Sequence, residues 1–378
     1  MQVNKHNGTW ILLLWMVCIQ GCVEPYSPEI PDAGKSMVIE GLLSDSEGYY
    51  YVRVSRSAAY YEPDYIPLSG CMVEVTDQTG NSVLFNEREP GLYEQWISQD
   101  FLVIGNLYKL LVTHEGNRYE SSFQELLQSA PIGETYYEVE SRETTDPEIT
   151  HQGIQFYTEF DVPEGFAENY RWELEETWEY HSNYPITFYW DGSRILPPGS
   201  VNSDLYKCWN TASIHNIFTA TTRLSKESRI SEFPLNYVSN ETDRLKVKYS
   251  LLVKQYALSD EAYEYWHQLQ QISQESGGLY DTQPPQLRGN MFNAENDDQL
   301  VLGYFSVSGM AEKRIFVSED FNFFPVFNDC SPFLPLGGYP RNNPYYLVEH
   351  EGQLMMAKDL CFDCTLLGGT TIKPGFWE

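Results

Sequence analysis

The stretch from Met37 to Ser122 alternates apolar and polar side chains over short runs, and turn-forming residues separate the runs about every ten residues. The clearest run is Tyr51–Ser55, in which Val52 and Val54 lie on one face. Alternation with a period of two is typical of a strand with one buried face. No helical periodicity competes with it here. Several short strands in sequence therefore predict a β-sandwich of immunoglobulin-like or transthyretin-like type over residues 37–125.

A second β-rich domain is expected over residues 147–378, after a boundary region between residues 126 and 146. Residues 170–175 alternate apolar and charged side chains, which predicts a half-buried strand. One helix is expected at 259–276, because Ser259 can cap its N-terminus and apolar residues then repeat at helical spacing. Those apolar residues are Ala262, Tyr265, Trp266, Leu269 and Ile272. The expected fold class is mainly β, with one main α-helix in the second domain.

The chain is strongly acidic, with 54 Asp and Glu against 24 Lys and Arg and a formal net charge of −30. Nucleic-acid binding needs a basic footprint, and so does docking on an anionic lipid surface. The charge therefore argues against both functions. Aromatic residues make up 15% of the chain, with 28 Tyr and 9 Trp. Tyr and Trp suit sheet packing and binding surfaces alike, and sheet packing is the favoured interpretation.

Residues 1–21 have the build of a lipoprotein signal peptide. A polar start with a single lysine precedes an apolar run at 10–17, which is far too short to span a bilayer. Gly21 is a small residue directly before Cys22, so Cys22 is the expected lipidation site. The alternative is an ordinary cleaved signal with a cysteine nearby. Residues 22–36 contain three prolines and are expected to form a lipidated tether.

Seven cysteines are present, and export would place them in an oxidising compartment. Cys18 lies in the signal peptide and Cys22 is assigned to the lipid. Cys71 lies in an apolar strand pattern and is expected to be a buried free thiol. The remaining four are expected to form two disulfides, with all three pairings open. These four are Cys208, Cys330, Cys361 and Cys364.

Residue types that build catalytic or metal sites do not occur at the required spacings. The seven histidines are scattered, and no two lie within one helical turn. The pair Cys361–Cys364 would need a second pair of ligands to hold zinc. The acidic groups at 295–298 and at Glu173, Glu175 and Glu176 lack the spacing of a calcium loop and are interpreted as solvated. We therefore expect no metal, no cofactor and no enzymatic activity.

Several stretches together resemble one family. They are Cys22–Tyr26, Met37–Gly41, Arg229–Pro234, Leu252–Leu258, Tyr280–Asp281 with Gln283–Pro284, Gly289–Asn290, Gly303–Phe305, Lys313–Arg314 and the closing run Cys361–Trp377. With these, the chain resembles the Bacteroidota lipoprotein family described only as domain of unknown function 4249. The closing run is the most specific part. The resemblance implies an outer-membrane lipoprotein, often encoded beside a TonB-dependent receptor, and it implies no catalytic residues.

The leading functional hypothesis is a non-catalytic lipoprotein of the outer membrane, on its periplasmic or cell-surface face, which assists a TonB-dependent transporter or binds its substrate. One alternative is a hydrolase of glycans or peptides that uses carboxylates dispersed in sequence. Another is a structural or adhesion module. A contact surface is expected in the aromatic stretch Tyr184–Trp190, through Tyr184, Tyr189 and Trp190. The competing interpretation is that these rings close the core of the second domain.

The lipid anchor can be tested by the substitution Cys22→Ala. We expect the variant to lose labelling by a fatty-acid analogue and to move from the membrane to the soluble fraction, because stable anchoring needs more than one acyl chain. Metabolic labelling followed by fractionation measures both effects. A Cys22→Ala protein that stays labelled and membrane-bound would contradict the lipoprotein hypothesis.

Overall fold

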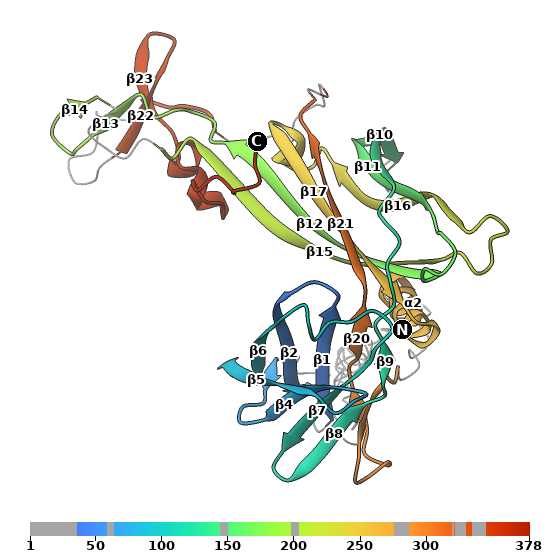
Figure 1. The fold of residues 1–378 in the computed structure, drawn as a ribbon. Helices are drawn as coiled ribbons and strands as arrows, with labels where there is room; N and C mark the ends of the chain where they lie inside the picture. Colours follow the sequence, from blue (N-terminus) through green and yellow to red (C-terminus); the bar gives the residue numbers. More distant parts are fainter. Residues whose placement is uncertain are drawn as a thin grey trace, which may run out of the picture.

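The computed structural model describes residues 36–58, 64–143, 150–197, 204–275, 287–319, 321, 330–334 and 345–378. The predicted signal peptide, Cys22 and the tether up to residue 35 lie outside the described residues. Within the described part the chain is mainly β, which confirms the expected fold class. Figure 1 shows the strands gathered into two β-sandwiches and a smaller outlying sheet.

The first sandwich is built from short, largely antiparallel strands. They are β1 (Met37–Ser44), β2 (Gly48–Arg56), β3 (Ile66–Pro67), β4 (Met72–Asp77), β5 (Ser82–Glu89), β6 (Leu92–Ile97), β7 (Leu107–His114), β8 (Asn117–Ser121) and β9 (Gln124–Glu125). The first half of β5 pairs with β4 and its second half pairs with β6, so two sheets meet at this strand. Both sheets point apolar residues into one core, which includes the predicted inward pair Val52 and Val54.

Three strands from much later in the chain complete the first sandwich. They are β18 (Met291–Asn293), β19 (Val301–Leu302) and β20 (Phe305–Ser308). β18 pairs with β8, whereas β19 and β20 pair in parallel with β1. Phe305 and Val307 are buried in the same core as Val52. The first β unit therefore combines residues 37–125 with residues 291–308, and the expected division into two consecutive segments does not describe it fully.

In the second sandwich, a three-stranded sheet packs face to face on a four-stranded sheet. The first contains β10 (Glu134–Glu143), β11 (Thr150–Asp161) and β16 (Arg229–Ser239). The second contains β15 (Lys207–Thr221), β12 (Asn169–His181), β17 (Lys248–Leu258) and β21 (Met310–Val317), in that order. Alternate residues of β12 enter the core, among them Tyr170, Trp172 and Leu174. The indole Nε1 of Trp172 donates to the side chain of buried Gln255, at 3.1 Å.

A single extended segment belongs to both sandwiches. β20 ends at Ser308 and β21 begins at Met310, so only Gly309 separates them, and Figure 1 shows the two strands end to end. The N–H of Gly309 donates to the carbonyl of Leu127 at 2.8 Å, and its own carbonyl accepts the N–H of Ala257 at 3.0 Å. A Cβ at this position would lie 2.3 Å from the Leu127 oxygen. The crossing therefore requires glycine.

The helix α2 (Asp260–Glu275) follows β17 directly and lies at the junction of the two sandwiches (Figure 1). As expected, Ser259 caps it: its Oγ accepts the N–H of Ala262 at 3.2 Å. Tyr265 stacks on Tyr304, which belongs to the first sandwich, with ring centroids 4.6 Å apart. Among the described residues, no helix has the length and apolar character that a membrane crossing requires.

The role of the crossing can be tested by Gly309→Ala. We expect this variant to lose about 1–3 kcal/mol of unfolding free energy, because the added methyl group meets backbone atoms that cannot rotate away. Gly48→Ala is the matched control, since a Cβ there meets nothing within 4 Å, and its effect should stay within about 0.5 kcal/mol. Urea denaturation measures both. Equal stability of the two variants would contradict the assigned role of Gly309.

Candidate functional site

A hollow of about 440 Å³ lies on the outer face of the four-stranded sheet, beside α2. Arg171, Glu173 and Glu175 point into it from β12, and Lys254 lines it from β17. Trp266 of α2 forms the side wall. The alternation that buries Tyr170, Trp172 and Leu174 thus sends the charged residues of the same strand outward into this hollow.

Three charged side chains in this hollow, Arg171, Glu173 and Glu175, are already paired within the protein. Nη2 of Arg171 lies 2.7 Å from a carboxylate oxygen of Glu173, and its guanidinium stacks over the Trp266 ring at 4.0 Å. Glu175 is paired with Arg314 at 3.2 Å. The Nε of Arg171 has no hydrogen-bond partner among the described residues. These contacts hold the Arg171 guanidinium against the Trp266 ring, and they give Glu173 and Glu175 an ion-pair partner each.

A second hollow of about 570 Å³ lies on the other side of β15, between the two sheets of the sandwich. Five carboxamides and no carboxylates appear among its described lining residues. The carboxamides are Gln155, Asn216, Asn236, Gln270 and Gln274. The rings of Phe233 and Tyr237 line it too, and Arg142 lies over the Tyr237 ring at 3.7 Å.

The two hollows adjoin at β15 beside α2, and together they are called here the α2 groove. Asn216 lines both hollows. On α2, Trp266 lines the first hollow, while Gln270 and Gln274 line the second, and a spacing of four places these three residues along one helix face. The strand β15 is bulged between them, since residues 215–217 stand opposite the single residue Glu173. Bulges of this kind re-aim side chains beside functional sites.

Four short strands form a separate sheet that projects from the far end of β12 and β15 (Figure 1). They are β13 (Phe188–Trp190), β14 (Ile195–Leu196), β22 (Tyr345–His350) and β23 (Gln353–Met356). With the 3-10 turns η3 (Asp359–Cys361) and η4 (Cys364–Leu367), they make up what we call the projecting module. Ile186, Val348 and Phe362 are buried in its core.

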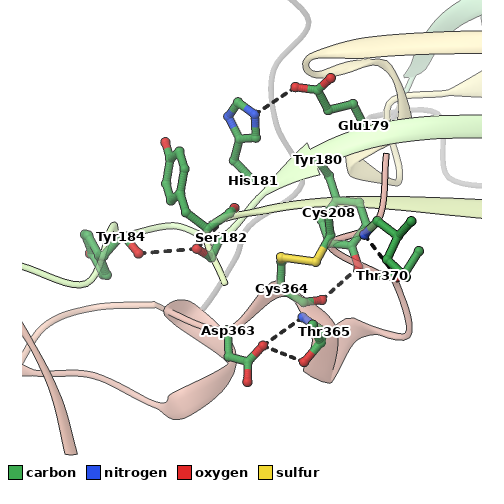
Figure 2. Close-up of a disulfide and its surroundings, with 12 residues drawn as sticks. Glu179, Tyr180, His181, Ser182, Tyr184, Cys208, Asp363, Cys364, Thr365 and Thr370 are labelled. Carbon is green, nitrogen blue, oxygen red and sulfur yellow. Dashed lines mark hydrogen bonds and ion pairs between the residues drawn. A yellow bond between two sulfur atoms is a disulfide. The ribbon is translucent and has the colours of Figure 1, made fainter. Parts of the chain in front are cut away.

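Two disulfides hold the projecting module, as expected from the cysteine count. Cys208 at the start of β15 is bonded to Cys364, and Cys330 is bonded to Cys361. Figure 2 shows the first of these, where the hydroxyl of Tyr180 also donates to the Cys364 carbonyl at 2.8 Å. The fifth cysteine, Cys71, is a free thiol as expected, but it is half-buried rather than fully buried. Burial raises its pKa.

The three aromatic residues of the predicted contact surface have different surroundings. Tyr184 packs against the module core, and its hydroxyl donates to the Cys330 carbonyl at 2.6 Å. Tyr189 pairs across the sheet with Tyr346, which also packs against this core. Trp190 is half-buried and lies on the opposite face of the sheet, because adjacent strand residues point to opposite sides. Tyr184 is therefore a packing residue, and contact through Trp190 stays a prediction.

The closing run of the chain packs on the four-stranded sheet of the second sandwich. Trp377 is buried, and its indole Nε1 donates to Glu179 at 3.1 Å. The same carboxylate pairs with Lys207 and with His181, each at 3.0 Å, and Figure 2 shows the contact with His181. Burial by itself would raise the pKa of Glu179, but its donors outweigh burial and hold the pKa below its usual value.

One expectation about the acidic residues is wrong. Glu176 is buried rather than solvated, because it follows Glu175 on the strand and points into the sandwich. There it pairs with Arg244 at 2.7 Å and accepts the hydroxyl of Tyr249 at 2.8 Å. No group of three or more His, Cys, Asp or Glu side chains suited to a metal ion occurs among the described residues.

Sequence reasoning missed the α2 groove, although part of its signal was present. The helical spacing of Trp266, Gln270 and Gln274 is visible in the sequence, but the strand beside them is not. It also missed an exposed pair on the first sandwich, Tyr49 and Trp96, whose ring centroids are 5.1 Å apart. The alternation that buries Val52 and Val54 could have placed Tyr49 on the outer face.

The profile of the family described as "Domain of unknown function (DUF4249)" matches residues 23–314. The chain belongs to this family. The match spans both sandwiches, α2 and the α2 groove, and it ends before the cysteines of the projecting module at 330, 361 and 364.

Comparison with curated proteins gave no match. Among solved structures, trypsin-activated alpha-2-macroglobulin from Escherichia coli is similar over 64% of this chain, with 12% identity and a TM-score of 0.19. The chain covers only 16% of that protein. At that score the similarity says nothing about the fold or function of the DUF4249 chain.

The buried carboxylate of Glu179 gives a pH-dependent prediction. Since its folded pKa is depressed, its stabilisation is present above about pH 4.5 and is lost as the pH falls through the folded pKa. We expect Glu179→Gln to lose about 2 kcal/mol at neutral pH and to flatten the dependence of unfolding free energy on pH in the acid range. Urea denaturation at a series of pH values measures this. Glu164→Gln, at an exposed carboxylate, is the control, and identical pH profiles for the two variants would refute the assignment.

Proposed function

We propose that this protein is a non-catalytic, lipid-anchored protein of the outer membrane, on its periplasmic or cell-surface face, that binds a substrate for a TonB-dependent transporter. The observation that carries the proposal is the α2 groove, a formed hollow with ring walls and several hydrogen-bonding side chains. Hollows of this size are typical of ligand sites. The lipid anchor is supported by the Gly21–Cys22 pair after a short apolar run, and the Bacteroidota lipoprotein assignment by the sequence resemblance.

The projecting module is the proposed contact with the transporter. It extends beyond the end of the second sandwich, at the opposite end of β12 from α2 (Figure 1). A partner bound there would leave the groove open to its ligand. Two disulfides brace the module, so a contact through Trp190 would cost little ordering entropy.

A second candidate function is hydrolysis, because Glu173 and Glu175 both line the groove. Glycosidases use two carboxylates on either side of the bond that breaks, one of which must donate a proton. Here each carboxylate already forms an ion pair with an arginine of the protein, at 2.7 Å for Glu173 and 3.2 Å for Glu175. This pairing favours the binding role.

The test is affinity purification of the tagged, lipidated protein from outer membranes after mild crosslinking. We expect a TonB-dependent receptor to copurify, and we expect Trp190→Ala to lower its yield at least threefold. Trp96→Ala is the matched control, because Trp96 is 49% exposed on the first sandwich, and its yield should equal that of the wild type. Absence of any barrel receptor, or turnover of a glycan or peptide by the purified protein, would contradict the proposal.

A further inference from the structure

The α2 groove differs in charge from the chain that surrounds it. The chain carries 54 carboxylates and a net charge of −30. In the groove, the described lining residues include only two carboxylates, Glu173 and Glu175, against three cations. The cations are Arg142, Arg171 and Lys254. The charges of the groove therefore nearly balance, although the whole chain is strongly acidic. A site with balanced charges neither selects a cationic ligand nor strongly attracts an anionic one.

Three carboxamides on β15 and α2 supply hydrogen-bonding groups to the groove: Asn216, Gln270 and Gln274. The side chains of Gln274 and Asn216 form no hydrogen bond with any described residue, and both residues are exposed and line the groove. Gln270 uses its carbonyl to accept the hydroxyl of Thr219 at 2.5 Å, which orients its amide. A carboxamide offers both donors and an acceptor, and so does an alcohol hydroxyl. A row of amides therefore matches a ligand that presents many neutral hydroxyl groups.

Ring side chains lie beside these amides in both hollows. Trp266 is fixed by the guanidinium of Arg171, and Phe233 is fixed by stacking on Trp172 with ring centroids 4.6 Å apart. Flat rings of this kind offer apolar contact area without loss of side-chain entropy. Hydroxyl-rich rings with apolar faces are the chemistry of sugars. Because two hollows follow one another along α2, the groove suits several linked units rather than one.

From this geometry we propose that the α2 groove binds a neutral oligosaccharide, with Asn216 and Gln274 as direct hydrogen-bonding residues. The proposal rests on the binding role proposed above and names its substrate class. The Nε of Arg171 is buried and has no hydrogen-bond partner among the described residues. We therefore assign Arg171 to fixing the Trp266 ring and not to contact with the ligand.

The experiment is titration calorimetry of the full-length protein in detergent with neutral linear oligosaccharides of glucose, mannose and xylose. We expect at least one series to bind. Its affinity should not change between low and high salt, because a neutral sugar forms no ion pair with the protein that salt could screen. Asn216→Ala and Gln274→Ala should each weaken binding about fivefold, the loss expected for one or two hydrogen bonds. Neither residue holds the fold, so melting temperatures should be unchanged.

Gln268→Ala is the matched control, because it is the same residue type on the same helix but lines a different hollow. Its affinity should equal that of the wild type. Failure of every sugar series to bind, binding unaffected by both groove variants, or groove-dependent binding of peptides in place of sugars would each overturn the proposal. Receptor copurification is measured in a separate experiment. If the receptor copurifies but no sugar binds, only the proposed substrate class is refuted.

Discussion

The hydrogen bonds around Gly309 join the two sandwiches into one body. The residue before it completes a strand of the first sandwich, and the residue after it begins a strand of the second. Its backbone is bonded to residues 127 and 257, and the next N–H, that of Met310, donates to Asp45 at 2.8 Å. Four distant parts of the chain thus meet at one point. The position of α2, and with it the groove, depends on this junction, because α2 packs on strands of the second sandwich and on Tyr304 of the first.

Much of the fold could be predicted because it depends on local patterns. The strands around Val52 and Val75, the strand at 170–175 and the helix that Ser259 caps all follow from periodicities of two or about 3.6 residues. The cysteine count predicted two disulfides. What could not be predicted depends on long-range pairing: the parallel addition of Phe305–Ser308 to β1, and the pairing of Cys208 with Cys364. Neither has a signature in the residues on either side.

The candidate site was harder to predict for the same reason. Its walls come from β10, β11, β12, β15, β16, β17 and α2, and no motif marks where these meet. The aromatic stretch Tyr184–Trp190 has side chains with different roles. Tyr184 supports the Cys330–Cys361 disulfide, whereas Trp190 lies on the other face of its sheet. Glu176 was misjudged because one residue along a strand decides between solvent and core. Arg171, Glu173 and Glu175, by contrast, are where alternation along β12 places them.

The completion of the first sandwich by residues 291–308 has a consequence for the order in which the chain can fold during synthesis. A chain that emerges from its N-terminus first would normally close its leading domain while the rest is still being delivered. Here β1 keeps one bare edge until Val301–Ser308 arrives, more than 250 residues later. An unpaired edge held open for that long is a template for wrong pairing. This topology therefore places a demand on chaperones that a pair of independent sandwiches of the same size would not.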